Sequence, residues 1–166
     1  MTLPDLRHRF PGLADGWVRL DGPAGTLPVD LAIDAVHAYL VSSAPANVGG
    51  CFEASARTGA LVDDVRAEVG RLLGAGSSRV IFGASSTALV FAFTRALARQ
   101  WKGGERIVCT RLDHDSNVSP WLHVADDTGA VVRFAGFDTS TGRLPVEAIE
   151  SLLTDRTRWV AVTGAS

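Results

Sequence analysis

Residues 106–134 read RIVCTRLDHDSNVSPWLHVADDTGAVVRF, and this stretch decides the fold. It opens with a short apolar run at 106–109, continues with a helical pattern at 118–127, and ends with a second apolar run at 130–134. Two strands separated by a connection that contains a helix pair in parallel. The stretch therefore predicts one β-α-β unit of a parallel sheet.

The same alternation continues on both sides of this unit. Upstream, residues 79–82 are predicted as a strand and 87–100 as a helix; downstream, 145–153 are predicted as a helix and 159–162 as a strand. Short apolar strands that alternate with helices indicate an α/β fold with a mostly parallel sheet and helices on both faces. Two earlier helices are expected, one opening at Pro28 and one over residues 53–73.

Composition restricts the class of protein. The 166 residues are 46% hydrophobic and 20% charged, which is typical of a soluble globular chain with a real core. The net charge of −2 includes no block of like charges, so we expect neither a nucleic acid nor a membrane as partner. Cys51 and Cys109 lie far apart, and the first ten residues have no apolar signal-peptide segment, so a reducing cytoplasm is the expected location.

Two segments at the carboxyl ends of predicted strands carry candidate site residues, and open α/β sheets bind ligands at that edge. The first is Gly83-Ala84-Ser85-Ser86, in which a glycine turn leads into a helix that begins with hydroxyl residues. Free N–H groups and the helix dipole attract a phosphate to such a place. The alternative interpretation is that Ser85 or Ser86 serves only as the helix N-cap.

The second segment is 112–121, LDHDSNVSPW, which places His114 between two aspartates. Successive side chains of Asp-His-Asp point in different directions, and the other histidines have no matching spacing, so no metal site is expected. A serine hydrolase that uses Ser85 and His114 would want G-x-S-x-G, and residues 83–87 lack its last glycine. His114 could also lay its flat ring against a planar ligand, or be incidental while Asp115 or Ser116 caps the next helix.

These two segments carry a resemblance to a known family. Residues 113–121, DHDSNVSPW, resemble the E-H-H-[SA]-N-[IV]-V-P-W stretch of cysteine desulfurases, which belong to the class V aminotransferase group of fold-type I pyridoxal-phosphate enzymes. Residues 84–87 fall where that family has its phosphate-binding turn, G-[AT]-T-E. The match extends over essentially the whole chain, from 18–26 (VRLDGPAGT, resembling Y-L-D-N-A-A-T-T) to 157–166 (TRWVAVTGAS, resembling T-R-L-V-A-[IV]-T-H-x-S-N).

The resemblance implies a cofactor and roles for three residues. Ser85 and Ser86 would bind the phosphate of pyridoxal 5'-phosphate, and His114 would stack on the pyridine ring and assist proton transfer, as both a cofactor-binding and a catalytic residue. Asp115 stands where the family has a second histidine. The cofactor would carry the chemistry, and the protein would orient it.

The resemblance also implies a domain organisation. Residues 1–50 would form an N-terminal segment with the first helix, and 51–166 an incomplete pyridoxal-phosphate-binding large domain, truncated before the Schiff-base lysine. Lys102, the single lysine, is expected in a turn at the opposite edge of the sheet. We therefore expect the N-terminal portion of a transferase or lyase that acts on an amino acid, inactive alone and homodimeric at full length. The alternatives are a non-catalytic binding or assembly module and the small serine hydrolase.

Overall fold

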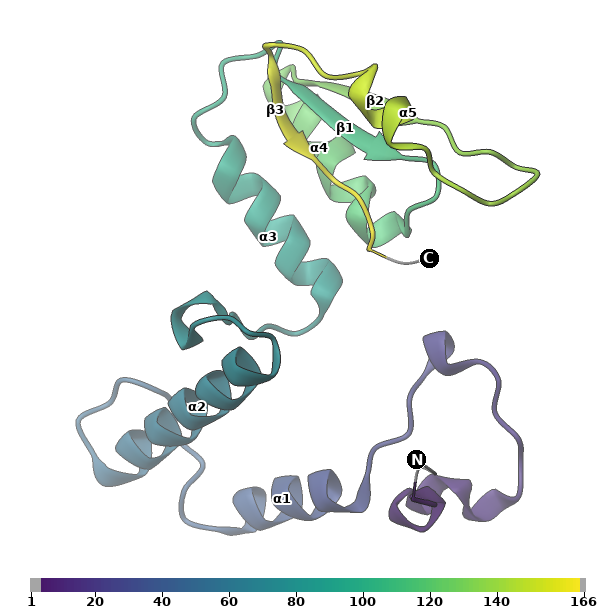
Figure 1. Cartoon of the computed structure of the whole chain (residues 1–166). Coiled ribbons are helices and arrows are strands. Elements are labelled where there is room, and N and C mark those ends of the chain that lie inside the picture. The colour runs from purple at the N-terminus through teal and green to yellow at the C-terminus, as the bar shows by residue number, and fades with distance from the viewer. Residues whose placement is uncertain (1–3, 165–166) are drawn as a thin grey trace. The chain divides into compact units, whose positions relative to one another are not determined.

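The computed structural model describes residues 4–164 and divides into two compact units, residues 1–81 and residues 82–166 (Figure 1). The first unit holds two long helices, and the second holds the sheet. Among residues 4–164, no helix combines the length and the apolar composition that a bilayer-spanning segment needs.

The sheet of the second unit has three parallel strands in the order β2-β1-β3. They are β1 (Arg106–Thr110), β2 (Val131–Ala135) and β3 (Thr157–Val160). Ile107, Val108 and Cys109 of the central strand are fully buried, although successive side chains face opposite sides of the sheet. Burial on both faces is why this strand is apolar without alternation, and it confirms the predicted α/β fold with a parallel sheet.

One face of the sheet is covered by α3 (Ser86–Ala98) and α4 (Ser119–Thr128). The buried centre of this layer is formed by Trp121 of α4 with Ile107 and Cys109 of β1 and Ala161, which directly follows β3. The Trp121 ring stacks on that of Trp159, with ring centroids 5.4 Å apart. Leu97 of α3 packs against the same cluster, so both helices share one apolar layer.

The other face lies next to α5 (Val146–Glu150), drawn in front of the strands in Figure 1. The Arg106 side chain on this face donates a hydrogen bond from Nη1 to the carbonyl of Leu152, just after α5, at 3.3 Å. Helices therefore flank both faces, as the sequence predicted. The predicted helix 145–153 is shorter in the structure and ends in turns.

A β-bulge sets the register between β1 and β3. Arg106 pairs with Thr157, but Ile107 pairs with Trp159, which leaves Arg158 as an extra residue in β3. A regular ladder would place Arg158 beside Ile107. The bulge instead puts the Trp159 indole on the core side with Ile107 and Trp121.

The first unit contains α1 (Asp30–Val41) and α2 (Glu53–Leu72), with 3₁₀ turns at 7–9, 11–15, 22–24 and 77–79. The two helices are joined by a hydrogen bond of 2.8 Å between the hydroxyl groups of Tyr39 and Thr58. The chain reverses closely after α2, where the N–H of Ala75 donates to the carbonyl of Gly70 at 2.8 Å.

The strand predicted at 79–82 does not form. Arg79 ends a 3₁₀ turn, and Val80 is extended, with φ −99° and ψ 122°. The backbone thus has strand-like angles, yet no β-ladder in the described part of the chain includes these residues, and Ile81 is 72% exposed. An apolar β-branched run predicts extended backbone, but a strand also requires a neighbour for its N–H and C=O groups.

Two glycines of α2 provide a test of the close reversal after that helix. A Cβ on buried Gly70 would lie 2.8 Å from the carbonyl oxygen of Ala75, whereas a Cβ on Gly59 would meet nothing within 4 Å. We expect Gly70→Ala to lower the free energy of unfolding by about 1–3 kcal/mol, because backbone must move. Gly59→Ala should raise it by about 0.5–1 kcal/mol through helix propensity. Urea denaturation of both variants measures the difference, and equal effects would contradict the packing described.

The two cysteines should differ in reactivity. Burial, with a smaller effect from the charge of Asp113, raises the pKa of the Cys109 thiol to about 12, while Cys51 is exposed. Because the thiolate is the reactive form, the native chain should be alkylated at Cys51 alone near neutral pH. Peptide mapping after iodoacetamide treatment identifies the site. Cys51→Ala should react only when denatured, and rapid native labelling of that variant would show that β1 is accessible.

Candidate functional site

Both segments singled out in the sequence lie at the carboxyl edge of the sheet. α3 begins at Ser86, and β1 leads into a loop with a 3₁₀ turn at Asp115–Asn117 before α4. This turn contacts α3, and Figure 1 shows the amino end of α3 and the start of α4 toward the ends to which β1 and β3 point. The structure therefore brings Ser85, Ser86 and His114 to the same edge of one unit.

The turn before α3 is tightly folded. A Cβ on Gly83 would lie 2.5 Å from Cδ2 and 2.7 Å from Cγ of Leu89, so a side chain there would require the Leu89 side chain to move. Ser85 is the N-cap, and its Oγ accepts a hydrogen bond from the N–H of Ala88 at 3.1 Å. Ser85 thus has the capping role that the sequence allowed, and this bond leaves its own O–H proton available to a ligand.

Ser86 and Thr87 supply the donors of this turn. Both are exposed, and neither their N–H groups nor their hydroxyls have a hydrogen-bond partner among residues 4–164. The first N–H groups of any helix lack partners within it and point toward solvent at the positive end of the helix dipole. Two N–H groups with adjacent hydroxyls form a donor set that fits a phosphate group.

The His114 imidazole is held by the residue two positions later. Its Nδ1 lies 2.8 Å from Oγ of Ser116 and accepts the backbone N–H of Ser116 at 3.1 Å. The side chain therefore caps the 3₁₀ turn while its ring stays exposed. The contact with Ser116 fixes the orientation of the His114 ring, which presents a flat face at the end of β1.

The carboxylates of the two aspartates that flank His114 accept hydrogen bonds from groups other than the imidazole. Asp113 accepts bonds from the N–H of His114 at 3.0 Å and from Nδ2 of Asn117 at 3.1 Å. Asp115 accepts the hydroxyl of Ser119 at 2.7 Å. Neither carboxylate contacts the imidazole, so no histidine–carboxylate pair forms. Within residues 4–164, no three His, Cys, Asp or Glu side chains are placed to hold a metal ion.

The hydrolase alternative requires contact between Ser85 and His114. In the described chain no hydrogen bond joins them: Ser85 Oγ accepts from Ala88, and His114 Nδ1 binds Ser116. A nucleophile and its base need to lie within hydrogen-bond reach of each other. The geometry favours two separate roles for these residues over a Ser-His pair.

A cavity of about 250 Å³ lies at this edge, and its lining includes Asp113 and Asp115, the two residues that flank His114 in the sequence. Sequence reasoning did not single out two of its residues, Thr110 and Arg111. The Thr110 hydroxyl is buried with no partner among the described residues, and the Arg111 guanidinium lies 5.4 Å from the centroid of the Phe134 ring. Their position at the end of β1 was the signal that could have found them. The cavity is lined by Thr110, Arg111, Asp113, Asp115, Val118 and Phe134.

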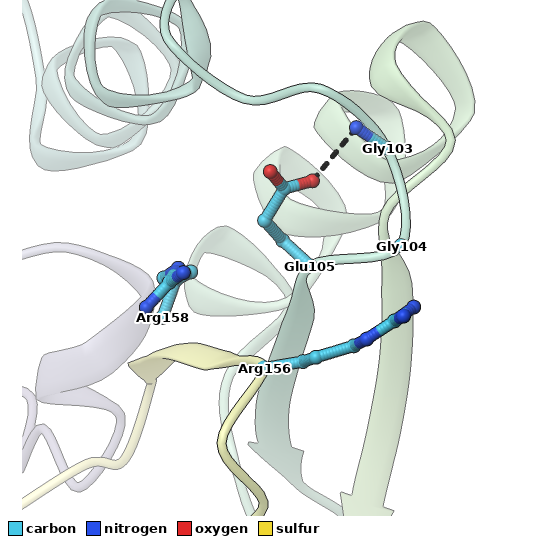
Figure 2. Close-up of a pocket in the computed structure, with 5 residues that line it drawn as sticks. All are labelled: Gly103, Gly104, Glu105, Arg156 and Arg158. Carbon is cyan, nitrogen blue, oxygen red and sulfur yellow. Dashed lines mark hydrogen bonds between the residues drawn. The ribbon is translucent and has the colours of Figure 1, made fainter.

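A second cavity, of about 150 Å³, lies at the amino edge of the sheet (Figure 2). The Glu105 carboxylate accepts the N–H groups of Lys102 and Gly103, each at 2.8 Å, and these bonds lower the pKa of Glu105. Figure 2 shows Arg156 and Arg158 extending to different sides of Glu105, so their guanidinium groups do not converge. Lys102 lies at this edge, as the sequence predicted, and not near His114.

A family model matches most of the chain. Residues 18–166 match the model for class V aminotransferases. An uncharacterised protein of Mycobacterium tuberculosis is 35% identical over 161 residues, which are 97% of this chain and 40% of that protein.

Solved structures of relatives show the same fold. The cysteine desulfurase CsdA of Escherichia coli is 29% identical over 160 residues, and its crystal structure superposes with a TM-score of 0.78 at 25% identity over 93% of this chain and 39% of that chain. A structure of C-DES with glycine covalently linked to its pyridoxal-phosphate cofactor has a TM-score of 0.76 at 20% identity, over 95% of this chain and 40% of that one. This chain thus spans about 40% of the length of these relatives.

Substitution of two neighbouring serines tests which of them caps α3. Ser85→Ala removes the N-cap of α3, and we expect the free energy of unfolding to fall by about 1 kcal/mol. Ser86→Ala removes a hydroxyl with no partner among the described residues, so its effect should stay within about 0.5 kcal/mol. Chemical denaturation of the two variants measures both values. If Ser86→Ala lowered the free energy of unfolding as much as Ser85→Ala does, the assignment of Ser85 as the N-cap of α3 would be contradicted.

Proposed function

The chain belongs to the class V aminotransferase family, and on that premise we propose that it forms the phosphate-binding turn and the ring-stacking histidine of a pyridoxal-phosphate enzyme acting on an amino acid. The observation that carries the proposal is the donor set of Ser86 and Thr87, which has no hydrogen-bond partner among residues 4–164 and lies at the same edge of the sheet as His114. A phosphate oxygen accepts hydrogen bonds, and the backbone N–H groups and hydroxyls of this turn can donate them.

Each residue has a defined part in the proposal. The N–H groups of Ser86 and Thr87 and the hydroxyls of Ser85 and Ser86 bind the phosphate, where the α3 dipole favours negative charge. The exposed His114 ring packs against the pyridine ring and holds a proton next to it. When bound, pyridoxal phosphate supplies the electron sink for chemistry at the α-carbon of an amino acid.

Lys102 has no part in this site. It lies at the amino edge of β1, whereas the candidate residues lie at the carboxyl edge. We therefore assign cofactor binding to this chain and do not assign covalent attachment of the cofactor to Lys102. We retain residues 1–50 as an N-terminal segment and 51–166 as part of the cofactor-binding large domain.

The reaction we propose is a transferase or lyase step by a cytoplasmic homodimer. Support comes from the family match and from the likeness to the cysteine desulfurase CsdA, of which this chain spans 39%. In E. coli CsdA and in C-DES the region of similar fold is part of a longer chain.

Titration of the full chain with pyridoxal phosphate tests the proposal. Tryptophan fluorescence and visible absorbance should report saturable binding in which inorganic phosphate competes. We expect Ser86→Ala to weaken binding roughly tenfold, because a hydrogen bond to a charged group is lost. His114→Ala should weaken it roughly fivefold through the lost ring contact.

Lys102→Ala is the matched control and should leave the affinity unchanged, because that residue lies at the other edge of the sheet. An equal loss in Lys102→Ala would show that the aldehyde reacts nonspecifically with the lysine. A stable chain with no saturable binding would instead favour the non-catalytic binding or assembly module.

A further inference from the structure

The contact between His114 and Ser116 determines which ring nitrogen carries the proton. A backbone N–H can only donate, and that of Ser116 points at Nδ1 of His114 over 3.1 Å. Nδ1 must therefore hold a lone pair. In the opposite tautomer, or in the imidazolium ion, two N–H hydrogens would face each other along this line.

We propose that Ser116 is a positioning residue that fixes the His114 imidazole as the neutral tautomer protonated on Nε2 and holds its ring orientation. The Ser116 hydroxyl, 2.8 Å from Nδ1, can rotate to donate to the same lone pair. Two donors from one residue then bind one nitrogen, and Nε2–H is the ring's remaining polar group.

The surrounding turn holds Ser116 in place. Asn117 donates its backbone N–H to the carbonyl of His114 at 2.9 Å and its Nδ2 to Asp113 at 3.1 Å. On the other side, Asp115 accepts the Ser119 hydroxyl at 2.7 Å. The aspartate that replaces the family's second histidine thus ties the turn to the first residue of α4.

The consequence for chemistry rests on the proposed function. With Nδ1 bound to Ser116, the neutral ring offers a ligand stacked on it only the Nε2–H group. The site therefore presents a hydrogen-bond donor at a defined atom.

Nuclear magnetic resonance of the ¹⁵N-labelled full chain tests the assignment without any cofactor. Under mildly alkaline conditions, where histidine rings are generally neutral, long-range ¹H–¹⁵N spectra should show His114 as the Nε2–H tautomer. A scalar coupling across the hydrogen bond should link Nδ1 of His114 to the backbone nitrogen of Ser116. His37, exposed on α1, serves as the reference for an unrestrained ring.

Two variants of Ser116 separate the hydroxyl from the N–H. Ser116→Ala should keep the coupling, because the N–H remains, but should move the Nδ1 resonance part of the way toward that of His37. Ser116→Thr keeps the hydroxyl and should restore the original signal. In pyridoxal phosphate titrations Ser116→Ala should bind roughly threefold to fivefold more weakly, with Ser116→Thr close to the parent chain.

The His114→Asn variant controls for the capping role. Its side-chain oxygen can still accept the Ser116 N–H, so stability should be retained while ring signals and ring stacking are lost. An Nδ1–H pattern for His114, or His114 spectra indistinguishable from those of His37, would overturn the assignment even if pyridoxal phosphate binds. If the cofactor does not bind, the proposed function fails, and the spectra still decide the tautomer.

Discussion

The double pairing of β1 is the constraint on which the second unit depends. Its backbone bonds to β2 on one side and β3 on the other, and the pairing continues past the strand, where the N–H of Arg111 donates to the carbonyl of Ala135 at 3.0 Å. A strand bonded on both edges and covered on both faces cannot shift without losing every contact at once. The loop that holds His114 therefore starts from a fixed point.

The candidate site is built on this scaffold by short-range bonds. Ser85 caps α3, His114 caps the turn before α4, and Asp115 binds the first residue of α4. In the first two cases a side chain accepts a backbone N–H that the start of a helix or turn leaves without a partner, and in the third two side chains bind each other. The candidate residues Ser85 and His114 are thus also the residues that begin α3 and the turn before α4.

The sequence predicted the β-α-β unit at 106–134 because burial on both faces leaves a clear apolar signature. The same signature at 79–82 led to a wrong prediction, since residue pattern does not report whether a partner strand exists. The position of His114 at the carboxyl edge followed from topology, because β1 precedes it. Ser85 also lies at this edge, although the strand predicted before it does not form. The His114–Ser116 contact could not be predicted, because it depends on the direction of one backbone N–H. The burial of the Thr110 hydroxyl, which has no partner among residues 4–164, could not be predicted either, because it depends on how completely the strand end is covered.

The bulge in β3 makes the composition of the core depend on the register of one strand. Side chains alternate along a strand, so the single extra residue decides whether an indole or a guanidinium group enters the layer beneath α4. A regular ladder that starts from the Arg106–Thr157 pair would place Arg158 beside Ile107, and a charged group would then face the Trp121 ring. The register at which β3 pairs with β1 is therefore as strict a requirement of this layer as the presence of Trp159.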